Sequence, residues 1–304
     1  MCLGDICLNK RRSERDSRSA FATVYHWVYM HTDNPATFKL VALDIDGTIR
    51  SDEHPISART RNVIDLVRDA GAAVTLATGR TFKSAVRQAA DLEITTPIAS
   101  FQGAQVSDPV SDDVLWHMPL TSAMSRVAID AMAGWDVEVM GYRGDAVFVS
   151  EATEWSSRYG IRNDVELNEV GDLASFSETE LTRLVAKGDD DVIERLETTL
   201  RSQFNSELYV TRSLSYFCEV LHPDGGKDKA LEWLCGHLGV DRTETLVFGN
   251  GYNDIPMLLW GGHSVAVGGA VPQALDAADA IAPPIEEEGV AKVLEDLLDR
   301  GMIG

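Results

Sequence analysis

The stretch FKLVALDIDGTIR, residues 38–50, decides the fold of this chain. It runs through apolar residues and then places two aspartates, Asp44 and Asp46, directly around Ile45 and before Gly47. Burying one carboxylate without a partner is costly, and two close carboxylates resist joint ionisation. A divalent cation would keep both ionised, because its positive charge favours the ionised form of nearby carboxylates. The alternative is an ordinary strand-to-turn junction, where Asp and Gly are common for backbone reasons.

Composition narrows the class of protein and of partner. With 304 residues and 44% hydrophobic content, the chain can form one large domain, or a core with a smaller inserted domain. A net charge of -21 argues against nucleic acid and anionic membrane surfaces as partners, since both recruit Lys and Arg. Acidic residues far outnumber the seven lysines. Two hypotheses explain this surplus equally well: the surface is adapted to a cytoplasm of high salt concentration, or the protein is simply an acidic mesophilic one.

The cysteines and the apolar runs indicate a cytoplasmic protein. Cys2, Cys7, Cys218 and Cys235 have neither a zinc-site spacing nor the density of a disulfide framework, so we expect free thiols in a reducing cytosol. No stretch reaches the roughly 18 apolar residues of a membrane-spanning helix. Residues 1–37 imitate a signal peptide only poorly. We expect an unstructured extension there. Alternatively, the given sequence starts too far upstream and Met30 is the natural first residue.

From Phe38 onward the pattern is that of an α/β protein. Alternating strands and helices imply parallel strands joined by right-handed crossovers. In such sheets ligands bind at the carboxyl ends of the strands, where Asp44, Asp46 and Thr78 fall. Strands are predicted at 39–45, 72–80 and 97–106, with helices at 57–71 and 81–92.

The same alternation returns near the C-terminus. Helix, strand, turn and helix patterns occupy residues 218–304, so these residues complete the core begun at 38–120. Residues 121–217 mix helices with alternating strands, which is typical of an α+β insertion. The predicted fold is therefore an α/β, Rossmann-like parallel sheet with an inserted α+β cap domain.

Four stretches, in their order and spacing, resemble the haloacid dehalogenase superfamily, and more narrowly its Cof-type (subfamily IIB) phosphatases. They are LDIDGT at 43–48, ATGR at 77–80, the lysine of GGKDKAL at 225–231, and GNGYNDIPML at 249–258. The resemblance covers Phe38 to the C-terminus. It implies a cap inserted after the third strand that contacts the substrate.

The resemblance also implies a role for each matching residue. Asp44 would be the nucleophile that forms an aspartyl-phosphate, and Asp46 the acid that protonates the leaving oxygen and then activates water. Thr78 would donate to the phosphoryl oxygens and Lys227 would supply the local cation. Arg80 is a neighbour with structural or substrate contacts. The implied substrate-binding residues are Gly47, Thr78, Gly79, Lys227 and Asn253, and the implied Mg²⁺ ligands are Asp44, Asp46, Asn250 and Asp254.

The chain departs from the family pattern at three positions. Asn250 stands where the family has an acidic magnesium ligand; its carbonyl oxygen can still bind Mg²⁺, but the site loses one negative charge. Gln102 and Gly269 each replace a usual Asn. The implied nucleophile, acid, threonine and lysine are all present. We therefore expect these changes to adjust the activity and weaken Mg²⁺ binding, not to abolish catalysis.

The predicted function is a Mg²⁺-dependent phosphatase of a small phosphorylated metabolite: a sugar phosphate, phosphoglycolate, or a nucleotide or cofactor monophosphate. Two alternatives remain open, a phosphomutase on the same fold and a catalytically weakened protein that binds phosphate ligands. Substrate specificity should lie in the cap, where Trp135, Tyr142, Arg143, Trp155, Arg158, Tyr159 and Arg212 are unassigned candidates. The sequence predicts no oligomeric state.

Overall fold

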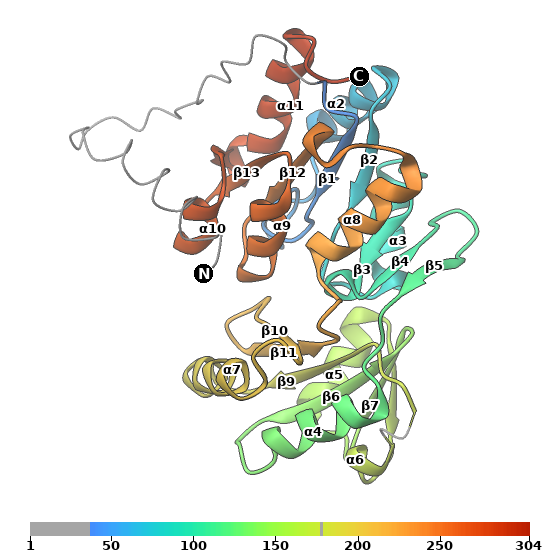
Figure 1. Ribbon diagram of the computed structural model, residues 1–304, viewed down its shortest axis with the longest axis vertical. Helices are drawn as coiled ribbons and strands as arrows, with labels where there is room; N and C mark the ends of the chain where they lie inside the picture. The colour runs from blue at the N-terminus through green and yellow to red at the C-terminus, as the bar shows by residue number, and fades with distance from the viewer. Residues whose placement is uncertain (1–36, 177–178) are drawn as a thin grey trace, which may run out of the picture.

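The computed structural model describes residues 37–176 and 179–304, so the predicted extension lies, apart from residue 37, outside the described residues. The described chain forms two parts, a core drawn at the top of Figure 1 and a cap below it. Both predicted features of the fold, a parallel core sheet and an inserted α+β cap, are confirmed.

The core is built on one parallel sheet in the order β14-β13-β12-β1-β2. A further short strand, β3 (Ile98–Ser100), continues the sheet next to β2 through the bridge between Ala77 and Ala99. The last strand, β14, was not predicted. The strands of the sheet are β1 (Leu40–Leu43), β2 (Ala73–Leu76), β12 (Thr245–Gly249), β13 (His263–Gly268) and β14 (Ala280–Pro284).

Helices cover both faces of this sheet (Figure 1). Since side chains alternate along a strand, β1 sends Val41 and Leu43 to one apolar cluster and Leu40 and Ala42 to another. Because both faces of β1 are buried in these clusters, all four of its residues are apolar. The first cluster includes α2 (Ala58–Asp69), α3 (Phe82–Asp91) and α11 (Gly289–Asp299); the second includes α8 (Lys227–Leu238), α9 (Ile255–Trp260) and α10 (Pro272–Ala277).

The single strand predicted at 97–106 is wrong. After β3 the chain turns through Phe101, Gln102 and Gly103, which all have positive φ. It then runs back as β4 (Gln105–Ser107), antiparallel to β3, and pairs with β5 (Val114–His117). Backbone at positive φ is rare for residues with a side chain, so Phe101 and Gln102 gave no sign of the reversal, and Gly103 was its only local signal.

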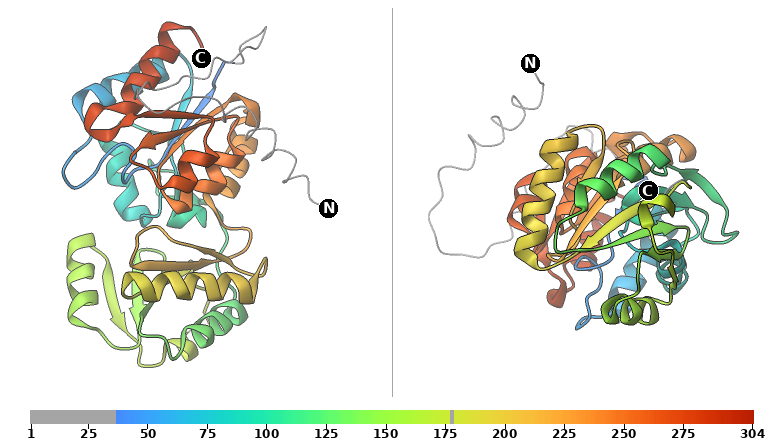
Figure 2. Two further views of the ribbon diagram at one scale, coloured as in Figure 1. Left: turned by 90° about the vertical axis from the view of Figure 1, so that its left-hand side faces the viewer. Right: turned by 90° about the horizontal axis from the view of Figure 1, so that it is seen from below.

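The cap is a six-stranded sheet in the order β10-β11-β9-β6-β7-β8. One face packs on α4, α6 and α7, while the other contributes Tyr142, Val185 and Phe217 to the apolar cluster shared with the core. Figure 2 shows the two parts from two further sides. The cap strands are β6 (Glu138–Arg143), β7 (Ala146–Val149), β8 (Glu166–Glu169), β9 (Arg183–Lys187), β10 (Tyr209–Thr211) and β11 (Phe217–Leu221); its helices are α4 (Ser122–Met132), α5 (Glu154–Asn163), α6 (Leu173–Phe176) and α7 (Asp190–Phe204).

The predicted boundary between residues 217 and 218 needs one correction. Strand β11 pairs with β9 and β10 and so belongs to the cap sheet through Leu221. The sequence FCEVL is apolar enough to suit either sheet, and only its pairing decides where it lies. The chain therefore re-enters the core at about His222.

Two simpler expectations can also be compared with the structure. Cys218 and Cys235 are free and buried, as expected, whereas Cys2 and Cys7 lie outside the described residues. Among residues 37–176 and 179–304, no helix is both long and apolar enough to cross a bilayer.

Candidate active site

Lys227 lies between two carboxylates at the centre of the candidate site. Its Nζ lies 2.6 Å from Asp44 Oδ1 and 2.6 Å from Asp254 Oδ1. All three side chains are buried, and Lys227 is completely enclosed. A buried ammonium group at this distance from two carboxylates forms charge-assisted hydrogen bonds with both. Residues of the first, third and fourth motifs thus lie in direct contact.

The parallel sheet brings these residues together. Strands β1 and β12 are neighbours, and Leu43 pairs with Phe248 at their carboxyl ends. The Asp44 N–H continues this ladder by donating to the Phe248 carbonyl over 3.0 Å. On the β12 side, Asp254 Oδ2 accepts the N–H groups of Asn250 and Gly251, each at 2.8 Å, and so shapes the turn that follows the strand.

Burial and charge act together on the ionisation of this cluster. Burial, aided by the charge of Asp254 and opposed by Lys227, raises the pKa of Asp44 to about 7. Burial opposes the charge of Lys227, but Asp254 and Asp44 outweigh it and raise the pKa of the lysine above its ordinary value. Further positive charge beside Asp44 would therefore favour its ionised form.

Asn250 and Thr48 complete the surroundings of Asp44. The Thr48 hydroxyl donates to Asp44 Oδ2 over 3.1 Å. The Asn250 amide is satisfied when its nitrogen faces Thr48 Oγ1 at 3.1 Å, Asp44 Oδ2 at 3.3 Å and the Asp46 carbonyl at 3.0 Å. At Gly47, which has φ +84°, a Cβ would fall 2.2 Å from the end of the Asn250 amide, so only glycine fits here.

The donor set beside Asp44 suits a hard cation. The described residues contain no cluster of three His, Cys, Asp or Glu side chains arranged as a metal site. What they offer instead is three neighbouring oxygens: with the amide turned round, the Asn250 oxygen lies 3.3 Å from Asp44 Oδ2 and 3.0 Å from the Asp46 carbonyl oxygen. A cation there would also stabilise the ionised form of Asp44. Both oxygens of Asp254 are already engaged, so its role as a ligand stays a prediction.

Asp46 does not point toward Lys227. Its two carboxylate oxygens accept hydrogen bonds from Arg80 Nε and Nη2, both at 2.7 Å. Arg80 Nη1 donates in turn to Ser84 Oγ at 2.9 Å. The sequence predicted structural or substrate contacts for Arg80 but did not pair it with Asp46, although the fork of a guanidinium matches a carboxylate.

The second motif follows β2, the neighbour of β1. Thr78 is buried, and its hydroxyl accepts the Arg80 N–H at 3.2 Å. At Gly79 a Cβ would fall 2.4 Å from Gln102 Nε2, so the glycine leaves space for that side chain. Asn253 is also buried and donates to Gln102 Oε1 at 2.9 Å. Thr78, Gly79 and Asn253 all line the same cavity as Asp44, and their contacts with phosphate stay predictions.

A buried ion pair ties the cap to this part of the core. Arg183 Nη1 donates to Glu219 Oε2 and to the Gly79 carbonyl, both at 2.7 Å. Gln102 Nε2 donates to Glu219 Oε1 at 2.7 Å. Sequence reasoning missed Arg183 and Glu219, because they belong to strands without a motif. The replacement of Asn by Gln at 102 now has a physical role, since the longer side chain reaches the cap.

Three of the four catalytic candidates, Asp44, Asp46 and Thr78, line a cavity of about 820 Å³ between core and cap, whereas Lys227 is enclosed and does not line it. Ligand pockets generally have volumes of this order. Of the seven candidates in the cap, Tyr142, Trp155, Arg158 and Tyr159 line it. The other three lie elsewhere: Trp135 packs against the far apolar cluster, Arg143 lies over Phe148, and Arg212 lies over Tyr252. Gly269 does not line the cavity.

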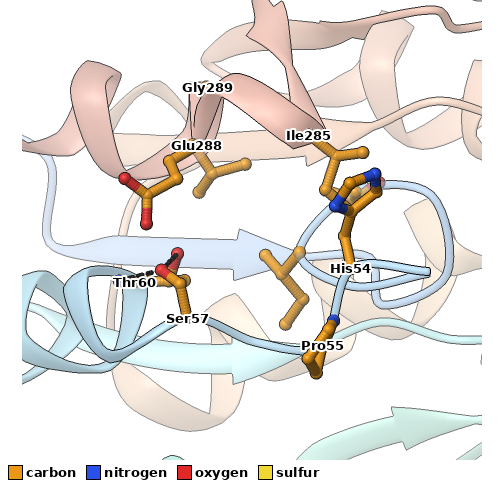
Figure 3. Close-up of a pocket in the computed structure, with 10 residues that line it drawn as sticks. His54, Pro55, Ser57, Thr60, Ile285, Glu288 and Gly289 are labelled. Carbon is orange, nitrogen blue, oxygen red and sulfur yellow. Dashed lines mark hydrogen bonds between the residues drawn. The ribbon is translucent and has the colours of Figure 1, made fainter. Parts of the chain in front are cut away.

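A second, much smaller pocket lies apart from these residues. Figure 3 shows it between the loop around His54 and Pro55, the start of α2, and the segment from Ile285 to Gly289. Its volume is about 20 Å³, which is enough for about one water molecule. The large cavity is therefore the candidate active site.

Comparison with known proteins agrees with the fold and the family. The sequence model of the haloacid dehalogenase-like hydrolases matches residues 41–294, so the chain belongs to this family, as the four motifs predicted. It is 27% identical to a 5-amino-6-(5-phospho-D-ribitylamino)uracil phosphatase of Bacillus subtilis, over 84% of this chain and 96% of that protein. It is 28% identical to an HMP-PP phosphatase of Serratia proteamaculans, over 78% and 86% of the two chains.

A solved structure supports the same assignment. A haloacid dehalogenase-like hydrolase from Bacteroides thetaiotaomicron superposes with a TM-score of 0.72 at 25% identity, covering 86% of this chain and 99% of that one. The prediction that the chain is an enzyme of this hydrolase family is confirmed.

Proposed function

We propose that the protein is a Mg²⁺-dependent, cytoplasmic phosphatase that hydrolyses the phosphate monoester of a small metabolite through an aspartyl-phosphate on Asp44. The observation that carries the proposal is the position of Lys227, held between Asp44 and Asp254 at the carboxyl edge of the sheet. Both relatives described above are named phosphatases, which supports the same reaction class.

In the proposed first step an Asp44 oxygen attacks phosphorus and the bond from phosphorus to the leaving oxygen breaks. Lys227 holds Asp44 in place and neutralises charge on the transferred group. Asp46 gives its proton to the leaving oxygen. In the second step water attacks the aspartyl-phosphate, Asp46 takes the proton from that water, and inorganic phosphate leaves with Asp44 restored.

The remaining residues position the phosphoryl group. Thr78, Gly47, Gly79 and Asn253 line the cavity beside Asp44 and would donate to the phosphoryl oxygens. Mg²⁺, when bound, supplies positive charge for the developing negative charge of the transition state. The residues proposed to hold it are Asp44, Asp46, Asn250 and Asp254.

The experiment is phosphate release from p-nitrophenyl phosphate, with and without Mg²⁺. The expected result is continuous, Mg²⁺-dependent release that Asp44→Asn abolishes. Asp65→Asn on α2, whose side chain is 50% exposed and pairs with Arg68, should leave the release unchanged. Activity of Asp44→Asn equal to that of the unaltered protein would show that the covalent scheme is wrong. A phosphomutase would instead move phosphate within a sugar phosphate without steady release, and a binding protein would show no turnover.

A further inference from the structure

Four buried side chains form a continuous series of hydrogen bonds from the cap to the candidate site. Arg183 Nη1 donates to Glu219 Oε2 at 2.7 Å, and Gln102 Nε2 donates to Glu219 Oε1 at 2.7 Å. Asn253 Nδ2 donates to Gln102 Oε1 at 2.9 Å. Asn253 lines the same cavity as Asp44, so the series ends beside the proposed nucleophile. We call Arg183, Glu219, Gln102 and Asn253 the relay.

The carboxylate of Glu219 fixes the direction of every hydrogen bond in the relay. Glu219 forms an ion pair with Arg183 and also accepts from the Ser213 hydroxyl, and an ionised carboxylate can only accept. Gln102 must therefore turn its nitrogen toward Glu219 and its oxygen toward Asn253. Asn253 must then turn its nitrogen toward Gln102. With either amide reversed, two buried donors or two buried acceptors would face each other, which is costly.

The fold holds Gln102 at the point where cap and core meet. Its backbone has φ +60° in the turn after β3, and its N–H donates to the Thr78 carbonyl at 2.9 Å. Gly79 leaves the space for its side chain, since a Cβ there would fall 2.4 Å from Gln102 Nε2. The backbone of Gln102 is thus set by the core, while the orientation of its amide is set by the cap.

We propose that Glu219 and Gln102 are positioning residues, through which the cap determines which way round the Asn253 amide stands in the substrate cavity. A primary amide nitrogen carries two N–H groups. One of those on Asn253 serves Gln102, and the other is the donor that the proposed function assigns to a phosphoryl oxygen. The consequence for phosphate binding therefore rests on the proposed function.

Glu219→Gln should reverse the relay without changing its shape. The new amide turns its oxygen to Arg183, because a guanidinium only donates. Its nitrogen then faces Gln102, so the amides of Gln102 and Asn253 must both turn round. In calorimetric titration with inorganic phosphate in excess Mg²⁺, we expect the dissociation constant to rise about tenfold, since a hydrogen bond to a charged group is worth at least this factor.

Adding Gln102→Glu to Glu219→Gln should bring the dissociation constant most of the way back. The carboxylate at position 102 then accepts from the amide at position 219 and from Asn253 Nδ2, which restores the original direction at Asn253. Gln102→Glu alone places two buried carboxylates in contact and should lower the urea midpoint of unfolding. A merely structural defect at position 219 would not be repaired by this second substitution.

The control makes the same change elsewhere in the cap. Glu138 of β6 accepts from the Thr153 hydroxyl at 2.8 Å, and Glu138→Gln should leave phosphate binding unchanged. An unchanged dissociation constant in Glu219→Gln, or no recovery in the double variant, would overturn the proposal. If Glu219→Gln does not fold, Gln102→Met replaces it, because methionine has a similar shape but lacks the amide. It should weaken phosphate binding, and unchanged binding would overturn the proposal.

Failure of the proposed function has a different signature. If the unaltered protein neither hydrolyses a phosphate ester nor binds phosphate, the proposed function is wrong, and unfolding in urea decides the orientation of the relay. Asn253→Asp alone sets a carboxylate against the Gln102 oxygen, whereas after Glu219→Gln it meets the Gln102 nitrogen. The two substitutions together should therefore lower the urea midpoint by less than the sum of their separate effects. Additive losses would overturn the inference.

Discussion

Arg80 binds both carboxylate oxygens of Asp46, through Nε and Nη2 at 2.7 Å each. Asp46 is the proposed acid and base, and its side chain is 51% exposed, so without this partner it would be free to rotate. Arg80 is itself held by Ser84 at the start of α3. The pair therefore positions the proton-transfer group at the mouth of the cavity.

Arg80→Lys should impair proton transfer more than phosphate binding. Lysine keeps the charge but loses the two-pronged geometry. We expect kcat to fall roughly tenfold to a hundredfold with an alkyl phosphate, whose poor leaving group needs the acid. With p-nitrophenyl phosphate, whose leaving group needs little protonation, the loss should be small. Arg61→Lys, which breaks an exposed pair with Asp91, is the control. An equal loss with both substrates would assign Arg80 to phosphate binding instead.

Lys227→Met should destabilise the fold as well as abolish activity. The substitution leaves Asp44 and Asp254 buried, close together and without their shared cation. Breaking a buried pair in this way generally costs about 3–5 kcal/mol of unfolding free energy. Urea unfolding measures the change, and Lys229→Met, exposed two residues further along α8, serves as the control. Adding Asp44→Asn to Lys227→Met should recover part of the loss, and no recovery would argue against charge as its cause.

The pH dependence of stability should include a contribution from His263. Burial, opposed by Asp279, lowers the pKa of His263 below its ordinary value of 6.5. As pH falls through about 6.5, the unfolded chain takes up this proton before the folded one does, so the folded state loses stability. His263→Gln should reduce the loss of unfolding free energy between roughly pH 7 and 5. His237→Gln, exposed on α8, is the control. An unchanged slope in His263→Gln would show that other groups cause the acid sensitivity.

Much of the site could be predicted because it follows strand ends. The parallel pairing of Leu43 with Phe248 places Asp44 beside the turn that contains Asn250 and Asp254. The residues that join cap and core could not be predicted in this way. Arg183 and Glu219 meet Gln102 only because the chain reverses at positive φ after β3, and because β11 pairs within the cap. Neither event leaves a pattern of charge or periodicity in the sequence.

The surplus of acidic residues predicts a response to salt. A net charge of -21 produces self-repulsion that dissolved ions screen. If the surface is adapted to a salty cytoplasm, the urea midpoint of unfolding should rise steadily as KCl increases from 0.1 to about 2 M. The same midpoint at every KCl concentration would favour the alternative of an acidic mesophilic protein.

Asn250→Asp should strengthen Mg²⁺ binding and weaken the metal-free fold. At present the Asn250 amide donates to Thr48, Asp44 and the Asp46 carbonyl, and the last two belong to the residues proposed to hold the cation. An aspartate would lose these donations and repel Asp44, but it would add one charge for the metal. We expect about a tenfold lower Mg²⁺ concentration for half-saturation in calorimetric titration, equivalent to about 1.4 kcal/mol.

The thermal midpoint separates this explanation from a general effect of charge. Without Mg²⁺, Asn250→Asp should melt below the unaltered protein, and added Mg²⁺ should raise its midpoint by more, because binding to the folded state alone stabilises it. Asn62→Asp makes the same charge change on the exposed face of α2 and should alter neither the midpoint nor the Mg²⁺ titration. If Asn250→Asp and Asn62→Asp respond to Mg²⁺ alike, residue 250 is not a ligand, and the amide is a structural link between Thr48 and the Asp46 carbonyl.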